Sequence, residues 1–216
     1  MVGEDSKFVP PDEFIPVAEY YSMMPELDRW VVREAFRYIA QVEPIENPPV
    51  FAINLSGQSL DEASFRDFVL DALKETGADA RMICFEITEA VAVNDLTLAT
   101  RFISSLKAKG SSFSLDDFGT GFSSFTGLQR LPISVIKVDR SIMPKSDEDK
   151  ANKKLFGALI MMIDYLGLTA VAEGVETQEQ FDYCRGLGVG RLQGFYMHKA
   201  VPLTDEFMHK LLTKSN

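Results

Sequence analysis

The chain of 216 residues is 46% hydrophobic and 25% charged, a composition typical of one soluble domain with a complete core. Its 22 basic and 32 acidic residues give a net charge of −10. An acidic surface argues against sequence-independent binding of nucleic acid or anionic lipid. We therefore expect a small anionic ligand to be held by metal ions or by local hydrogen-bond donors.

The two cysteines, Cys84 and Cys184, lie far apart in the sequence, so neither a disulfide framework nor a CxxC metal site is indicated. This cysteine usage fits a reducing, cytoplasmic environment. No run approaches the roughly 20 apolar residues of a membrane span, and the stretch MVGEDSKFVPP contains no apolar signal core. Direct membrane insertion is not expected, and a tether would belong to a further part of the protein.

Two helices are predicted first in the chain. The stretch from Pro11 to Tyr21 opens with Pro-Pro-Asp, and the stretch from Pro25 to Val42 carries apolar residues at helical spacing. Six short apolar runs follow and predict strands: FAINLS (51–56), ICFEITE (83–89), FSLDDFG (113–119), VIKVD (135–139), AVAEGVE (170–176) and LQGF (192–195). Helical periodicity fills the intervals between most of these runs.

Four helical stretches end in a glycine just before a strand, which is the position of a left-handed helix cap. They are Gly77, Gly110, Gly167 and Gly188. The units are about 28 residues long, close to the length of one unit of a (β/α)8 barrel. A doubly wound Rossmann sheet is the alternative, but FAINLSGQSL lacks the GxGxxG fingerprint. The prediction is an α/β, TIM-like (β/α)8 barrel in one domain, incomplete because about six of its eight parallel strands are present.

Polar side chains stand where these strands end, and the strand ends of a parallel barrel converge on one mouth. Asn54, Glu86 and Asp116 offer oxygen ligands from three successive strands. Oxygen ligands suit Mg²⁺ or Mn²⁺ and make a zinc site unfavourable. Taken singly, Asn54 could cap a helix and Glu86 could pair with a surface base. Their coincidence at three strand ends favours a metal site.

Asp116 and Asp117 are adjacent at one strand end. One carboxylate there could bridge two cations while its neighbour binds the second, as in two-metal phosphodiester hydrolysis. The alternative is an Asx turn into the sequence FGTG. Gly119 and Gly121 give this loop special geometry at the mouth, which is compatible with both interpretations.

Lys137 lies between two apolar residues of a short strand, so its side chain points away from them. Near the carboxylates, its ammonium could orient a water or stabilise charge on phosphoryl oxygens. A salt bridge with Asp139 outside the barrel is the alternative. Glu173 could bind the second metal or accept a proton from the water, whereas Glu176 fits an acid at a helix N-terminus.

Two further residues stand near these strand ends. Gln193 could contact ligand or water, or could be a buried strand-end amide. Glu89, three residues after Glu86, is a candidate anchor for the FGTG loop.

Taken together, NLSGQSL, EITE, LDDFGTGFSSF, IKVDRSI, AEGVETQEQF and LQGF, with FIPVAE near the start, closely resemble the EAL-domain family of cyclic-di-GMP phosphodiesterases. The match runs from about Pro10 to Phe207. The resemblance implies a modified (β/α)8 barrel that hydrolyses cyclic di-GMP to linear pGpG with Mg²⁺ or Mn²⁺.

Carried over by motif, the resemblance implies these metal ligands: Asn54, Glu86, Asp116, Asp117 and Glu173. It implies that Lys137, Glu173 and Asp117 act in catalysis and that Gln193 and Asp139 contact the substrate. It implies that the loops are held by Glu89, Gly119, Gly121 and Glu176.

The sequence lacks the Glu-Ala-Leu motif after which the family is named. No Glu-Ala-Leu tripeptide occurs in the 216 residues, although the family pattern uses its glutamate as a metal ligand and a nearby arginine as a phosphate contact. We expect that strand, and a preceding one beginning Tyr-Gln-Pro, upstream of Met1. With one carboxylate fewer, Mg²⁺ should bind more weakly, because it demands near-octahedral coordination. Activity of this form is therefore expected to be low or absent.

Two other functions remain open. The chain could be a non-catalytic cyclic-di-GMP receptor or protein-interaction module in bacterial signalling, with a sensor or cyclase domain upstream. A pure binder, however, has no chemical need for Asp116, Asp117, Lys137 and Glu173 together. A metal-dependent enzyme of the enolase type, with Lys137 as base on a carbon acid, fits the ligands but not the FGTG loop.

An incomplete barrel exposes two sheet edges and part of its core, and such edges tend to pair with another chain. We predict that the chain forms a homodimer, or else keeps an incompletely covered barrel. Sedimentation equilibrium should then give about twice the 24.1 kDa mass of one chain. A compact and highly stable monomer would contradict this expectation.

Overall fold

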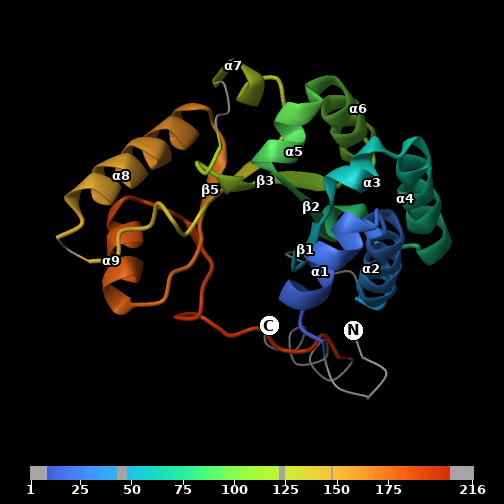
Figure 1. Ribbon diagram of the computed structural model, residues 1–216, viewed down its shortest axis with the longest axis horizontal. Coiled ribbons are helices and arrows are strands. Elements are labelled where there is room, and N and C mark those ends of the chain that lie inside the picture. The colour runs from blue at the N-terminus through green and yellow to red at the C-terminus, as the bar shows by residue number, and fades with distance from the viewer. Residues whose placement is uncertain (1–8, 43–47, 122–124, 147, 205–216) are drawn as a thin grey trace.

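The computed structural model describes residues 9–42, 48–121, 125–146 and 148–204. Within these ranges six parallel strands form one sheet, ordered as in the chain, that curls into a half-barrel (Figure 1). The strands are β1 (Phe51–Asn54), β2 (Ile83–Thr88), β3 (Ser112–Phe118), β4 (Val135–Val138), β5 (Thr169–Ala172) and β6 (Arg191–Leu192). The prediction of an incomplete parallel α/β barrel is confirmed.

Helices connect the strands, as the repeated pattern predicts. Before the sheet come α1 (Pro11–Tyr20) and α2 (Met24–Ile39). Within and after it come α3 (Gly57–Asp61), α4 (Ala63–Thr76), the 3-10 turn η1 (Ala80–Met82), α5 (Glu89–Asn94), α6 (Leu96–Lys107), α7 (Phe125–Leu128), α8 (Lys150–Tyr165) and α9 (Gln178–Gly186). The four glycines predicted to end helices all have positive φ, between 69° and 108°. None of the helices among the described residues has both the length and the apolar character needed to span a membrane.

The two faces of the sheet differ in chemistry because side chains alternate along each strand. The convex face carries large apolar residues such as Ile53, Phe85 and Ile136, all fully or almost fully buried. The concave face carries polar residues, and the parallel register sets Asn54 opposite Glu86. The convex face therefore builds the core, and the concave face is left for chemistry.

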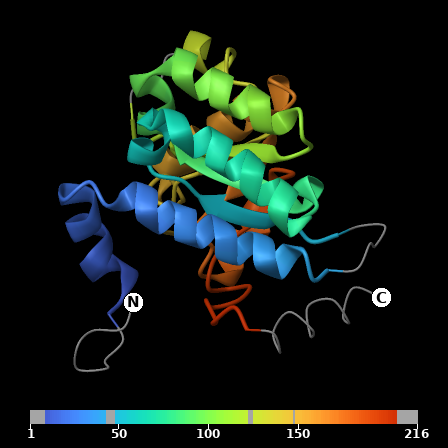
Figure 2. The same cartoon turned by 90° about the vertical axis from the view of Figure 1, so that its right-hand side faces the viewer.

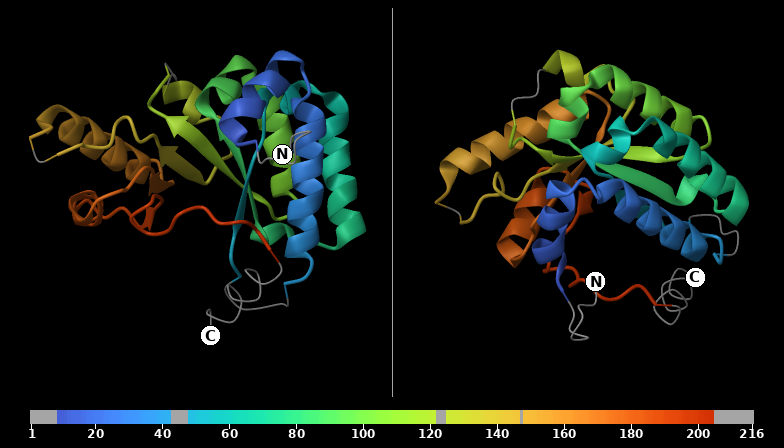
Figure 3. Two further views of the ribbon diagram at one scale, coloured as in Figure 1. Left: turned by 60° about the horizontal axis from the view of Figure 1, so that its bottom comes forward. Right: turned by 45° about the vertical axis from the view of Figure 1, so that its right-hand side comes forward.

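Apolar stripes of the helices complete that core. Figure 2 shows α2, α4 and α6 lying side by side, and Figure 3 shows the helices following the outer curve of the sheet. Four aromatic rings link these layers: Phe65 and Phe102 stack at 6.2 Å, Phe102 meets Phe113 at 6.0 Å, and Phe113 meets Phe85 at 5.4 Å between ring centroids. Helices α4 and α6 are thus packed against β2 and β3 through a continuous group of aromatic rings.

Substitution Phe85→Ala is expected to cost about 3 to 5 kcal/mol of unfolding free energy, because it leaves a cavity beneath fully buried rings. Urea unfolding followed by circular dichroism measures the change. The control is Tyr165→Ala on α8, where the side chain is 88% exposed and a change within about 0.5 kcal/mol is expected. Equal losses in the two variants would contradict the assignment of the core.

Candidate functional site

Lys137 lies at the centre of the concave face and is only 4% exposed. Its Nζ lies 2.9 Å from Glu86 Oε2, 3.1 Å from Asp116 Oδ2 and 2.8 Å from Glu173 Oε1. The three carboxylates come from β2, from β3 and from the residue directly after β5. One ammonium therefore gathers three acids that are far apart in the sequence.

A bulge in β3 explains how two adjacent aspartates reach the same place. Leu115 pairs with Ile136 and Phe118 with Val138, so β3 has one more residue than β4 over this interval. At the bulge, Asp117 has a φ of 55°. This left-handed conformation is one that aspartate adopts more readily than most residues. Its N–H donates to Asp116 Oδ1 at 3.0 Å. Both carboxylates are consequently left at the strand end.

The charges at this strand end do not balance. Burial works against the charged ammonium of Lys137, but its hydrogen bonds with Glu173 and Glu86 raise its pKa above the ordinary value. Burial raises the pKa of Glu173, the hydrogen bond and charge of Lys137 lower it, and the negative charges of Asp116 and Glu86 raise it again. The cluster thus carries an excess of negative charge.

Asp117 adds to this excess. The residue is exposed at the mouth, yet partial burial of its carboxyl and the charges of Asp116 and Asp139 raise its pKa. Carboxylate oxygens of Asp116, Asp117 and Glu173 all lie within 4.8 Å of one another. Oxygen donors at this spacing, with uncompensated negative charge, fit a hard divalent cation such as Mg²⁺ or Mn²⁺.

The remaining predicted ligands surround this cluster. Asn54 is exposed at the end of β1, on the same face as Glu86. Gln193 is also exposed, so the alternative of a buried amide is wrong, and its backbone bonds to Ala172 and Val175 keep it next to the strand that leads into Glu173.

Asp139 accepts a hydrogen bond from Ser141 N at 2.8 Å. Among the described residues no ion pair joins Asp139 to Lys137, so the alternative partner proposed for the lysine is wrong.

Glu89 is buried at the start of α5, and its Oε2 accepts a hydrogen bond from Gly119 N at 2.9 Å. A Cβ added at Gly121 would lie 2.9 Å from Glu89 Oε1, so the backbone approaches this carboxylate closely. Residues 122–124 of the same predicted loop lie outside the described residues. Glu176 is exposed in the turn before α9, where its N–H donates to Gln180 at 2.8 Å.

Sequence reasoning did not identify Ser114 as part of this cluster. Its hydroxyl donates to Glu86 Oε1 at 3.2 Å and is buried with it. The signal was available, because Ser114 precedes Asp116 by two residues and strand side chains two apart share a face.

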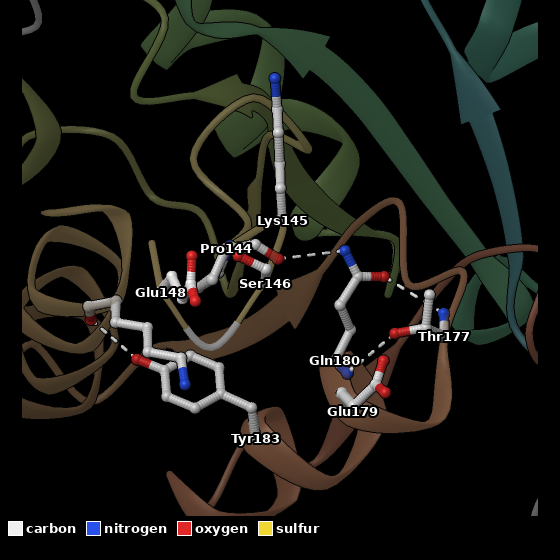
Figure 4. A pocket seen from close by; sticks show the side chains of 9 residues that line it. Pro144, Lys145, Ser146, Glu148, Thr177, Glu179, Gln180 and Tyr183 are labelled. Carbon is white, nitrogen blue, oxygen red and sulfur yellow. Dashed lines mark hydrogen bonds between the residues drawn. The ribbon is translucent and has the colours of Figure 1, made fainter. Parts of the chain in front are cut away.

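A cavity of about 360 Å³ lies elsewhere, between the β4–α8 connection and the start of α9. Figure 4 shows its lining, in which Gln180 donates to the carbonyl of Pro144 at 3.2 Å and Tyr183 to that of Lys153 at 2.7 Å. None of the predicted site residues lines it. The candidate site residues therefore lie on the concave sheet face and not in this cavity.

Residues 1–200 match the EAL domain family. The chain belongs to that family. The EAL domain is 35% identical over 198 residues to the oxygen sensor protein DosP of Escherichia coli and 34% identical over 201 residues to the cyclic di-GMP phosphodiesterase NbdA of Pseudomonas aeruginosa. These matches cover 91% and 92% of this chain but 25% and 26% of the relatives, so the chain spans about a quarter of their length.

Solved structures of EAL domains share the fold. The phosphodiesterase PaMucR, solved in complex with c-di-GMP, has a TM-score of 0.86 at 31% identity, covering 96% of this chain and 83% of that one. The half-barrel described here therefore matches most of the fold of a solved EAL domain.

Replacing Lys137 by methionine is expected to destabilise the domain by about 3 to 5 kcal/mol at pH 7, because buried carboxylates lose their only shared cation. The loss should be smaller at pH 5 than at pH 7, because burial raises the pKa of Glu173 and protonation of this carboxyl relieves part of the repulsion. Urea unfolding at both pH values tests this, with Lys154→Met on an exposed position of α8 as the control. A loss no larger than that of the control would refute the central role of Lys137.

Proposed function

We propose that this EAL domain hydrolyses cyclic di-GMP to linear pGpG by a two-metal mechanism. The observation that carries the proposal is the buried ammonium of Lys137 within 3.1 Å of three carboxylates, with Asp117 beside them. A site built only for binding an anion would not gather four acids around one cation. The names of the relatives NbdA and PaMucR support the same substrate.

The donor set suggests how the cations would be shared. Asp116, Asp117 and Glu173 would hold one cation, and Asn54 with Glu86 would contribute to the other. Bound divalent cations would supply positive charge to the phosphoryl oxygens and acidify water in the site.

Side chains of this domain would transfer the proton, stabilise the developing charge and contact the substrate. Glu173, whose Oε1 lies 2.8 Å from Lys137 Nζ at the strand end, would accept the proton of the attacking water. Lys137 stays charged and would stabilise the negative charge that develops on the phosphoryl group. As the water oxygen bonds to phosphorus, one of its protons would pass to Glu173 and the P–O bond to the sugar would break. The leaving sugar oxygen would take up a proton, equivalent to the one that Glu173 then releases. Gln193 and Asp139 stand at the margin of the mouth, where they would contact the nucleotide.

We further propose that the present form is slow. The glutamate of the Glu-Ala-Leu motif is not among the 216 residues, so one cation would lack a carboxylate and bind weakly. The setting proposed is bacterial cytoplasmic signalling, which the two free and buried cysteines support. A homodimer and an attached sensor or cyclase domain belong to the same proposal.

The test is hydrolysis of cyclic di-GMP with Mn²⁺, followed by chromatography of pGpG. Glu173→Gln is expected to lower kcat at least about 100-fold, as removal of a general base does, and a chelator should abolish turnover. Glu179→Gln, an exposed acid on α9, is the matched control and should be neutral. The same assays are run on an N-terminally extended form that carries a Glu-Ala-Leu strand, which should turn over faster. Binding without turnover in both forms would instead indicate a receptor.

A further inference from the structure

Asp28 is a buried acid in α2, only 4% exposed, within a helix face that otherwise packs Val32 and Phe36 into the core. Within the described ranges, the hydrogen bonds that Asp28 accepts come from uncharged donors. Oδ2 accepts from Ser56 N at 2.9 Å, from Ser56 Oγ at 2.7 Å and from Ser59 Oγ at 2.6 Å. A buried carboxylate needs such donors, and all three belong to one short turn.

That turn follows Asn54. Ser56 caps α3 by accepting a hydrogen bond from Ser59 N. The carboxylate of Asp28 therefore bonds to both of the serines that this cap joins. On the other side, Leu55 N donates to the carbonyl of Glu86 at 2.9 Å. The backbone at Asn54 is therefore fixed towards β2 by Leu55 and towards α2 by Ser56.

This double attachment matters because β1 is an edge strand. Among the described residues β1 pairs only with β2, so its outer side has no neighbouring strand to fix it. The carboxylate of Asp28 supplies from a helix the support that a second strand would otherwise give.

We infer that Asp28 is a positioning residue that holds Asn54 in place for a divalent cation. The inference rests on the proposed function in one respect, which is that Asn54 is a ligand of the divalent cation. Groups that orient a ligand typically change metal affinity 10- to 100-fold when removed. Because Asp28 acts through the backbone, the lower end of that range, about tenfold, is expected.

The adjacent residue of α2 provides a matched control. Arg29 donates to both carboxylate oxygens of Glu62 at 2.9 and 2.7 Å, and this hydrogen bonding lowers the pKa of Glu62 to about 2. The side chains of this pair attach α2 to the start of α4. Glu62 meets the turn after Asn54 through its backbone N–H, which donates to Ser59 O at 3.3 Å and which a glutamine would keep. Glu62→Gln therefore weakens a neighbouring attachment of the same helix.

The experiment measures Mn²⁺ affinity by electron paramagnetic resonance, without substrate, for the wild type and for Asp28→Asn, Glu62→Gln, Asn54→Ala and the Asp28→Asn/Asn54→Ala double variant. Asp28→Asn should raise the Kd for Mn²⁺ about tenfold and Glu62→Gln less than about twofold. In the Asn54→Ala background the Asp28 substitution should have no further effect, because the two act through one ligand.

Turnover gives a second reading. If Asp28 only positions a ligand, Asp28→Asn should raise the Mn²⁺ concentration for half-maximal activity while saturating Mn²⁺ restores most of kcat. Equal weakening of Mn²⁺ binding by Asp28→Asn and Glu62→Gln, or full additivity with Asn54→Ala, would overturn the inference. A wild type that binds Mn²⁺ but does not hydrolyse cyclic di-GMP would refute the proposed function alone, since the affinities still decide the role of Asp28.

Discussion

The attraction between one buried ammonium and three carboxylates organises the concave face of this domain. Lys137 can remain charged at 4% exposure only because Glu86, Asp116 and Glu173 surround it. The acids in turn can lie close together only because that cation reduces their repulsion. The ion pairs thereby link four neighbouring strands, β2 to β5, at the end where the chemistry would take place. The remaining negative charge is what a divalent cation would neutralise.

The geometry of the sheet brings these charged side chains together. Alternation along parallel strands puts the apolar side chains beneath the helices and the polar ones on the open face. The bulge at Asp116 and Asp117 then breaks alternation at the one place where two successive side chains are needed together. The scaffold is regular where it packs and irregular where the acids gather.

Much of this could be predicted from the sequence. Strand-end positions and glycine caps are local patterns, so the half-barrel and the gathering of Glu86, Asp116, Lys137 and Glu173 followed from them. The roles of these residues stay predictions. Asp28 was not predicted because its importance depends on a tertiary contact with Ser56, and the exposure of Gln193 depends on its place at the sheet edge. Neither is encoded by the spacing of neighbouring residues.

The order of the sheet has a consequence for how the domain forms. Every strand pairs with the strand made just before it, so the growing chain can extend the sheet one unit at a time during synthesis. Glu86 and Asp116 are synthesised before Lys137. When β4 is added to the sheet, the ammonium of Lys137 can therefore pair with carboxylates on β2 and β3. Glu173 arrives later and closes the cluster. If the strands join the sheet in chain order, this ammonium is buried only when carboxylates are already beside it.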